Sequence, residues 1–61
     1  MDKLLLRPVE AAEITGIGRS MMYQLIASGV IRVVRIGRSI RIPVEELQRW
    51  IRDQVADGDH R

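Results

Sequence analysis

Residues 31–43 change the hydrophobic pattern of the chain in a way that few small folds accommodate. They are rich in Val and Ile and are interrupted at Gly37 and Arg38, and such a run split by a glycine is typical of a β-hairpin. The segments on both sides instead repeat apolar residues at helical spacing. Since a chain of 61 residues buries only roughly 60% of its unfolded surface, the hairpin and the helices must share a single core.

Two short helices are predicted before the hairpin. The first begins at Pro8, whose fixed φ suits the first helical position, and ends at Thr15 and Gly16. Arg7 precedes it in place of a capping Ser, Thr or Asp, and the missing cap costs roughly 1 kcal/mol. After a tight turn the second helix runs to Ser28 and ends at Gly29.

The second predicted helix has one apolar side and one polar side. Met22, Leu25 and Ile26 fall within one third of a helical wheel. The other side carries hydroxyl, amide, phenol and guanidinium groups and no acid, and each of these groups can contact a phosphate or a base edge. The candidate contact residues on or beside this side are Arg19, Ser20, Met21, Tyr23 and Gln24.

The loop length of the hairpin is predicted from the parity of its apolar residues. A two-residue loop of Gly37 and Arg38 would mix apolar and polar side chains on both faces. A three-residue loop that also contains Ser39 instead pairs Ile36 with Ile40 on one face. We therefore expect the three-residue loop.

The same register places Arg35 opposite Arg41 on the other face, with Arg38 at the tip. Like charges directly opposite one another are destabilising. We therefore predict that an anion lies against this face, and we include Ser39 at the tip among its contact residues. The alternative is a hairpin whose arginines are merely solvated.

A third helix is predicted after Pro43. It carries Glu45 and Glu46 in its first turn, where the helix dipole favours acids. Residues 56–61 lack periodicity, so we expect a folded domain over residues 1–55 and a flexible tail that contains the exposed His60. The residues expected to face the core keep helical spacing: Val44, Leu47, Trp50, Ile51 and Val55.

Charge is distributed unevenly along the chain. Residues 14–44 contain five arginines and no acid, although the whole chain has a net charge of only +2. A planar guanidinium suits phosphates and guanine edges better than an ammonium does. This segment therefore favours a polyanionic partner, and the alternative is that its arginines pair with the acids at the two ends.

Several classes of function lack the residues they need. The chain has no Cys and a single His, so disulfide, thiol and zinc chemistry are not expected, and no metal or other cofactor is predicted. No nucleophile–base set can be assembled, and the apolar residues suffice for a core but not for an enclosed ligand cavity, so we do not expect an enzyme. No apolar run approaches the roughly 20 residues that span a bilayer, which predicts a cytoplasmic protein without membrane contact.

The order of these elements resembles that of the excisionase-like winged helix-turn-helix family, relatives of the mercury-resistance regulator DNA-binding domain. Residues 8–16 (PVEAAEITG) resemble the family's first helix, and residues 17–26 (IGRSMMYQLI) resemble its turn and recognition helix. Residues 34–38 and 41–43 are similar to its wing, and residues 45–51 (EELQRWI) to its closing helix. Arg7, Gly18 and Met21 stand where the family usually has Ser or Thr.

The resemblance implies an α+β fold with the order helix-turn-helix, β-hairpin wing and C-terminal helix. It also implies that Arg19, Ser20, Tyr23 and Gln24 contact the major groove and its phosphates, while Arg38 and Arg41 serve the wing in the adjacent minor groove. The function it favours is that of a phage or mobile-element excisionase, a recombination directionality factor that bends DNA. Its partners would be direct repeats in double-stranded DNA, further copies of itself and a site-specific integrase. A small transcriptional regulator and a protein-interaction module are the alternatives.

Overall fold

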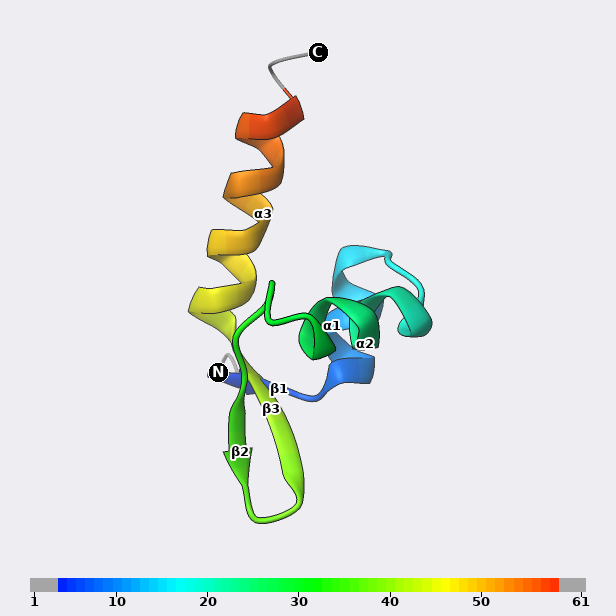
Figure 1. The fold of residues 1–61 in the computed structure, drawn as a ribbon, viewed down its shortest axis with the longest axis vertical. Helices are drawn as coiled ribbons and strands as arrows, with labels where there is room; N and C mark the ends of the chain where they lie inside the picture. The colour runs from blue at the N-terminus through cyan, green and yellow to red at the C-terminus, as the bar shows by residue number, and fades with distance from the viewer. Residues whose placement is uncertain (1–3, 59–61) are drawn as a thin grey trace.

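The computed structural model describes residues 4–58. A three-stranded antiparallel sheet and three helices form one α+β unit, in the order expected of a winged helix-turn-helix (Figure 1). The elements are β1 (Leu5–Leu6), α1 (Pro8–Thr15), α2 (Arg19–Ala27), β2 (Val34–Ile36), β3 (Ser39–Pro43) and α3 (Val44–Gly58).

The turn between α1 and α2 follows from one glycine. Gly16 has a φ of 75°, a left-handed conformation that glycine adopts without steric cost. Its N–H donates to the carbonyl of Glu13, and the N–H of Ile17 donates to the carbonyl of Ala12 at 3.1 Å. These two bonds form a Schellman motif that ends α1 and turns the chain toward α2. The predicted first helix is confirmed from Pro8 to Thr15. The side chain of Arg7 does not cap it, but the N–H of Arg7 donates to Oε1 of Glu10 at 2.9 Å.

The sheet has β3 at its centre, with β1 and β2 as its two edges. The sequence analysis did not predict β1. Its two residues pair with Pro43 and Ile42, and the N–H of Val44 donates to the carbonyl of Leu4 at 2.9 Å. The N-terminal segment is therefore fixed beside the strand that leads into α3.

The predicted register of the hairpin is wrong. Ile36 pairs with Ser39, and Arg35 pairs with Ile40, so the loop has two residues rather than three. Gly37 has a φ of 60°, and a positive φ at the first central position is the pattern of a type II′ turn, whose twist matches that of the strands. Every residue of β2 is exposed. Because no core covers this edge strand, the turn decides the register and the apolar parity does not.

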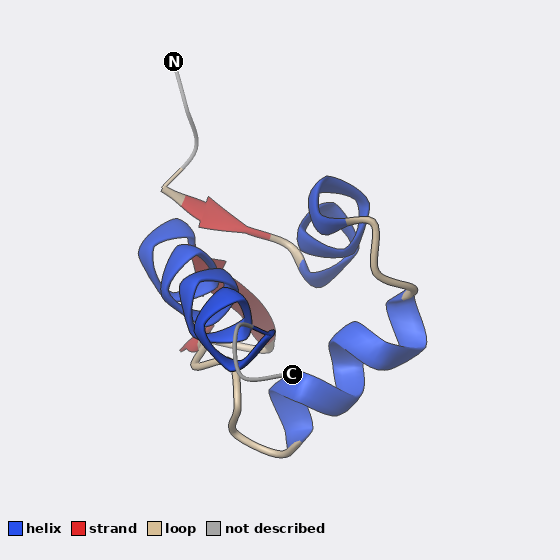
Figure 2. Cartoon of the chain, turned by 90° about the horizontal axis from the view of Figure 1, so that it is seen from above, coloured by secondary structure: helices blue, strands red, loops and turns tan. Residues whose placement is uncertain are grey.

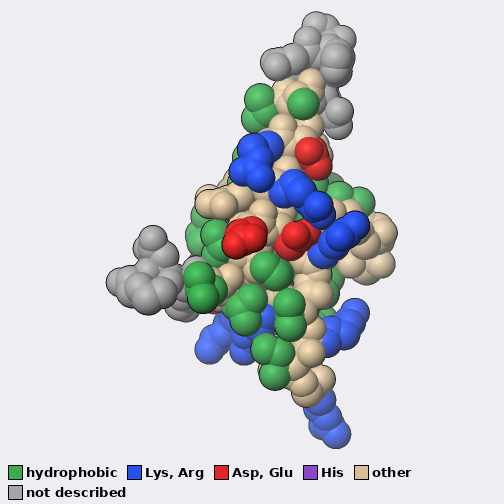
Figure 3. All heavy atoms as spheres, turned by 90° about the vertical axis from the view of Figure 1, so that its left-hand side faces the viewer, with side chains coloured by type: hydrophobic (Ala, Val, Ile, Leu, Met, Phe, Trp, Pro, Cys, Tyr) green, Lys and Arg blue, Asp and Glu red, His purple; other side chains and the backbone are tan. Residues whose placement is uncertain are grey.

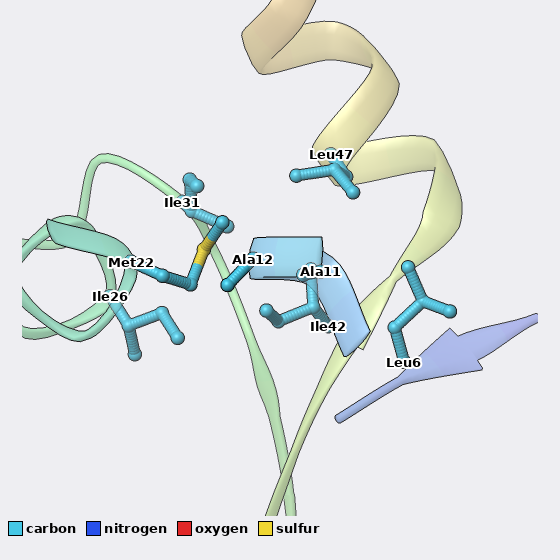
Figure 4. Close-up of a cluster of buried hydrophobic side chains, with 8 residues drawn as sticks. All are labelled: Leu6, Ala11, Ala12, Met22, Ile26, Ile31, Ile42 and Leu47. Atoms are coloured by element: carbon cyan, nitrogen blue, oxygen red, sulfur yellow. The ribbon is translucent and has the colours of Figure 1, made fainter. Parts of the chain in front are cut away.

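One core lies between the sheet and the helices. Figure 4 shows Met22 of α2 directed toward Ala12 of α1 and toward Ile31, while Leu47 of α3 lies on the opposite side of α1. The small side chains of Ala11 and Ala12 are almost fully buried, which lets the other elements approach α1 closely. The buried cluster consists of Leu6, Ala11, Ala12, Met22, Ile26, Ile31, Ile42 and Leu47.

Only the first half of α3 packs as predicted. Leu47 is buried, and Val44 and Trp50 pack against the core, whereas Ile51 and Val55 are exposed. Seen from above, α3 lies over the sheet, and α1 and α2 lie to one side of both (Figure 2). The helix continues to Gly58, beyond residue 55, where we expected the domain to end. His60 lies outside the described residues.

Candidate nucleic-acid interface

The second helix of the helix-turn-helix presents a polar surface. Met22 and Ile26 are buried and Leu25 is half-buried, which confirms the predicted apolar side. The opposite side is open to solvent over its whole length, since Ala27 is also exposed. The five residues that the sequence selected on α2 are all exposed: Arg19, Ser20, Met21, Tyr23 and Gln24.

The start of α2 adds backbone donors to this surface. Gly18 is the N-cap residue and provides no side chain to the first N–H groups of the helix, and the first turn holds no acid. Free N–H groups at a helix N-terminus, together with the helix dipole, favour an anion. Arg19 and Ser20 are exposed in the same turn, so α2 presents uncapped N–H groups at its start and a row of polar side chains along one side.

The hairpin projects from the end of the molecule opposite the free end of α3 (Figure 1). Arg38 is exposed at its tip. Since successive residues of a strand point to opposite faces, the pairing puts Arg35 on the face of the buried Ile42 and Arg41 on the outer face. The predicted juxtaposition of Arg35 and Arg41 is therefore wrong.

The two outer-face candidates have different surroundings. Arg41 is half-buried, and its Nη1 donates to the carbonyl of the adjacent Ile40 at 2.9 Å. Ser39 is exposed at the start of β3, on the same face of the strand as Arg41 by alternation. Arg35 therefore lies on the face of the hairpin that meets the helices, and Arg38 lies at its tip. Ser39 and Arg41 lie on the outer face.

The arginines of the basic segment are not neutralised by neighbouring acids. Among residues 4–58, the ion pair that the structure shows joins Arg49 and Glu46 of α3 at 2.7 Å, outside the basic segment. The alternative predicted from the sequence was that these arginines pair with the acids at the two ends of the chain. The described residues form no such ion pair. Exposed cations without internal partners are available to a polyanion.

Arg32 is a further candidate that the residue-by-residue selection missed. It is exposed in the loop between α2 and β2, directly after the bonds from Val30 and Ile31 to the carbonyl of Leu25 that end the recognition helix. The sequence shows only that Arg32 belongs to the acid-free segment. That position does not indicate on which surface of the fold its side chain lies.

Two other kinds of site are absent from the described part of the chain. No three His, Cys, Asp or Glu side chains gather there in an arrangement that could hold a metal ion. None of the helices within residues 4–58 combines the length and apolar character needed to cross a membrane.

Two helices joined by a tight glycine turn, an exposed polar second helix and a basic hairpin beside them define a winged helix-turn-helix DNA-binding domain. Residues 5–55 match the model of a family described as helix-turn-helix domain. The chain belongs to this family, and its resemblance to excisionase-type members is confirmed.

The chain is also similar to a probable excisionase of Saccharopolyspora erythraea. The two are 52% identical over 42 residues, which are 69% of this chain and 43% of that protein. The chain thus spans less than half the length of this relative. No solved structure is significantly similar to it.

Proposed function

We propose that this protein is a sequence-specific DNA-binding accessory factor that bends attachment-site DNA and sets the direction of a site-specific integrase of a phage or mobile element. The observation that carries the proposal is the exposed polar face of α2 together with a basic segment whose arginines form no ion pair with the acids of residues 4–58. The similarity to a probable excisionase favours the recombination role over other roles of the same fold.

The residues of α2 are proposed to read the DNA. Ser20, Tyr23 and Gln24 carry the hydroxyl and amide groups that recognise base edges in a major groove, and Arg19 at the helix start is suited to phosphate. Met21 offers an apolar side chain that can contact the methyl group of a thymine. The residues at the centre of α2 would thus read the base sequence, and Arg19 at its start would fix the position of the helix on the DNA backbone.

The hairpin is proposed to contact the duplex beside the recognition helix. Arg38 at the tip and Arg35 on the side of the helices have the geometry that favours this contact most. Arg41 and Ser39 remain candidates on the outer face. Both are predicted from the sequence, and Arg41 is also implied by the family resemblance. The negative potential of a minor groove stabilises a guanidinium there without requiring a particular base.

Binding in several copies follows from the size of the module. A single module of this kind buries roughly 600–1,000 Å² on DNA, which leaves little free energy for deformation. Bending a site of 20–30 base pairs costs on the order of 1–6 kcal/mol. Contacts along several copies on direct repeats can offset that cost, so we propose that the protein binds cooperatively.

Recombination in vitro with the cognate integrase, with and without this protein, tests the proposal. We expect excision to be stimulated and integration to be inhibited. Regulated transcription from a nearby promoter with no effect on either reaction would instead identify a transcriptional regulator. Binding to a protein partner with no salt-dependent affinity for duplex DNA would identify a protein-interaction module.

A further inference from the structure

Two neighbouring methionines of the recognition helix have opposite surroundings. Met21 is 50% exposed, whereas Met22 is fully buried. Figure 4 shows the side chain of Met22 directed into the core, toward Ala12 and Ile31. A reagent dissolved in the surrounding water therefore reaches the thioether of Met21 and does not reach that of Met22.

Met21 carries the one exposed sulfur atom within residues 4–58. The whole chain has three methionines and no cysteine, and Met1 lies outside the described residues. Figure 3 shows hydrophobic side chains gathered over the sheet, but the three strands contain no methionine. Since the chain has no thiol that could react first, an oxidant that prefers sulfur acts on Met21 in this part of the protein.

Met21 lies among the residues that we propose to read the DNA. Ser20 directly precedes it, and Gln24 follows it by three positions. Side chains three positions apart are neighbours on the surface of a helix, and both Ser20 and Gln24 are exposed. A change in the polarity of Met21 therefore takes place directly beside the amide group of Gln24.

We propose that Met21 is an oxidation site at which hydrogen peroxide lowers the affinity of α2 for its preferred sequence. This inference rests on the DNA-binding function proposed above and adds a means of regulating the same surface. The sulfur of Met21 attacks one oxygen of the peroxide, an S–O bond forms and the O–O bond breaks. The proton of the transferred oxygen goes to the leaving hydroxide, which departs as water. The sulfur loses two electrons and the peroxide gains them, so the product is methionine sulfoxide.

The sulfoxide differs from the thioether in two properties that matter for sequence readout. It turns an apolar side chain into a polar one, so the contact that Met21 offers to a thymine methyl group is lost. Its oxygen is also an acceptor beside Gln24, whose NH₂ group donates hydrogen bonds and can bond the sulfoxide instead of a base edge. The arginine–phosphate contacts, which hold any duplex, are not changed. Oxidation therefore lowers the affinity for the preferred sequence and spares the affinity for random DNA.

Two variants at the same position separate this switch from other effects of peroxide. Met21→Leu keeps the volume and the apolar character of the side chain but has no sulfur to oxidise. Met21→Gln places a neutral polar side chain there and imitates the sulfoxide. Both variants retain Met1 and Met22, so any effect of oxidising these two residues also occurs in Met21→Leu. Each protein is compared with itself before and after treatment with peroxide.

The measurement is fluorescence anisotropy on a duplex selected with the untreated wild type and on a random duplex of the same length. Peptide mass spectrometry after treatment should find one added oxygen at Met21 and none at Met22. Oxidation should lower the affinity of the wild type for the selected duplex at least about fivefold, or about 1 kcal/mol, and for the random duplex less than about twofold.

Reversal and mimicry complete the experiment. A methionine sulfoxide reductase with a thiol reductant restores the thioether and should restore the affinity of the wild type. Peroxide should leave the affinity of Met21→Leu unchanged. Met21→Gln should bind the selected duplex about as weakly as the oxidised wild type does. The circular dichroism of the oxidised wild type should match that of the untreated protein, because the modified side chain lies outside the core.

Three results would overturn the proposed switch while leaving DNA binding intact. The first is complete oxidation of Met21 with the affinity for the selected duplex still within twofold of its starting value. The second is an equal loss of affinity in Met21→Leu, which would place the cause at another residue. The third is a loss of helical signal on oxidation, which would assign the effect to unfolding. Failure of the untreated wild type to bind any duplex would instead overturn the proposed function, and the switch with it.

Discussion

Arg35 lies directly opposite Ile40 in the antiparallel pair of β2 and β3. Ile40 packs against the core and lies two residues before the buried Ile42, so the side chain of Arg35 lies on the face of the sheet that meets the helices. The side chain of Arg41 lies on the outer face. The two guanidinium groups, which the sequence suggested would oppose one another, are thus separated by the sheet and need not share an anion.

This separation predicts unequal roles for the two arginines in DNA binding. Arg35→Gln should weaken binding to specific and random duplexes alike and reduce the salt slope by about 0.9, the value for one lost phosphate contact. Arg41→Gln should change both quantities less. Anisotropy titrations of the two variants at several salt concentrations make the comparison. Equal losses would contradict the assignment of the inner face to DNA.

The affinity of the wild type for DNA should fall steeply with salt. Four or five arginine–phosphate contacts give a slope of about −3.6 to −4.5, or roughly a 150- to 500-fold loss between 50 and 200 mM salt. A mobility-shift or anisotropy titration on a single-site duplex measures the slope. A nearly flat response would rule out the proposed polyanionic partner.

Variants of α2 should change the sequence preference rather than the general affinity. Ser20→Ala and Gln24→Ala remove groups proposed to contact base edges. Gln24→Ala should weaken binding to the preferred site by about 1–3 kcal/mol, the value for a bidentate amide contact, and Ser20→Ala by about 0.5–1.5 kcal/mol, the value for a single hydrogen bond, while both leave random DNA nearly unaffected. Arg38→Ala is the matched comparison, since it should weaken binding to both duplexes. If Gln24→Ala weakened both duplexes equally, Gln24 would not be a reader of sequence.

The neighbouring methionines of α2 should have separate effects. Met22 is fully buried and Met21 is half exposed. Met22→Ala leaves a cavity and should cost about 2–5 kcal/mol, which is most of the stability of so small a domain. Met21→Ala should leave the free energy of unfolding within about 0.5 kcal/mol. Urea denaturation followed by circular dichroism tests both, and a stable Met22→Ala variant would contradict the packing of the core.

Local signals in the sequence predicted much of the fold. Pro8 and Gly16 gave the bounds of α1 because proline and left-handed glycine act within one turn of their own position. The spacing of Met22 and Ile26 gave the buried side of α2, since only that side of a helix at this period can face a core. The polar face of the recognition helix followed from the same spacing.

The sequence analysis was wrong where the structure depends on whether another element covers an apolar surface. Ile51 and Val55 continue the apolar spacing of Leu47, but periodicity indicates which side of a helix is apolar and not whether another element packs on it. The register failed for the same reason, because apolar parity fixes a register only where one face is buried. Residues 5 and 6 of β1 are too few for any pattern of alternation to identify them.

The turn at Gly37 gives a test of the register itself. Gly37 has a φ of 60°, and no other atoms lie where a Cβ would be added, so any cost of adding a side chain comes from the backbone conformation. Gly37→Ala should cost about 1–2 kcal/mol in unfolding free energy, because an L-residue resists this φ. Arg38 has no positive φ, so Arg38→Ala should stay within about 0.5 kcal/mol of the wild type.

Chirality makes this test independent of side-chain size. The chain has 61 residues and is short enough for chemical synthesis, so D-alanine can replace Gly37. A D-residue adopts positive φ readily and suits the first central position of a type II′ turn, and it also removes conformational freedom from the unfolded chain. The D-alanine protein should therefore be at least as stable as the wild type in urea, while the L-alanine protein is less stable. If both alanine proteins lost stability equally, the positive-φ turn at Gly37 and the two-residue loop it produces would be wrong.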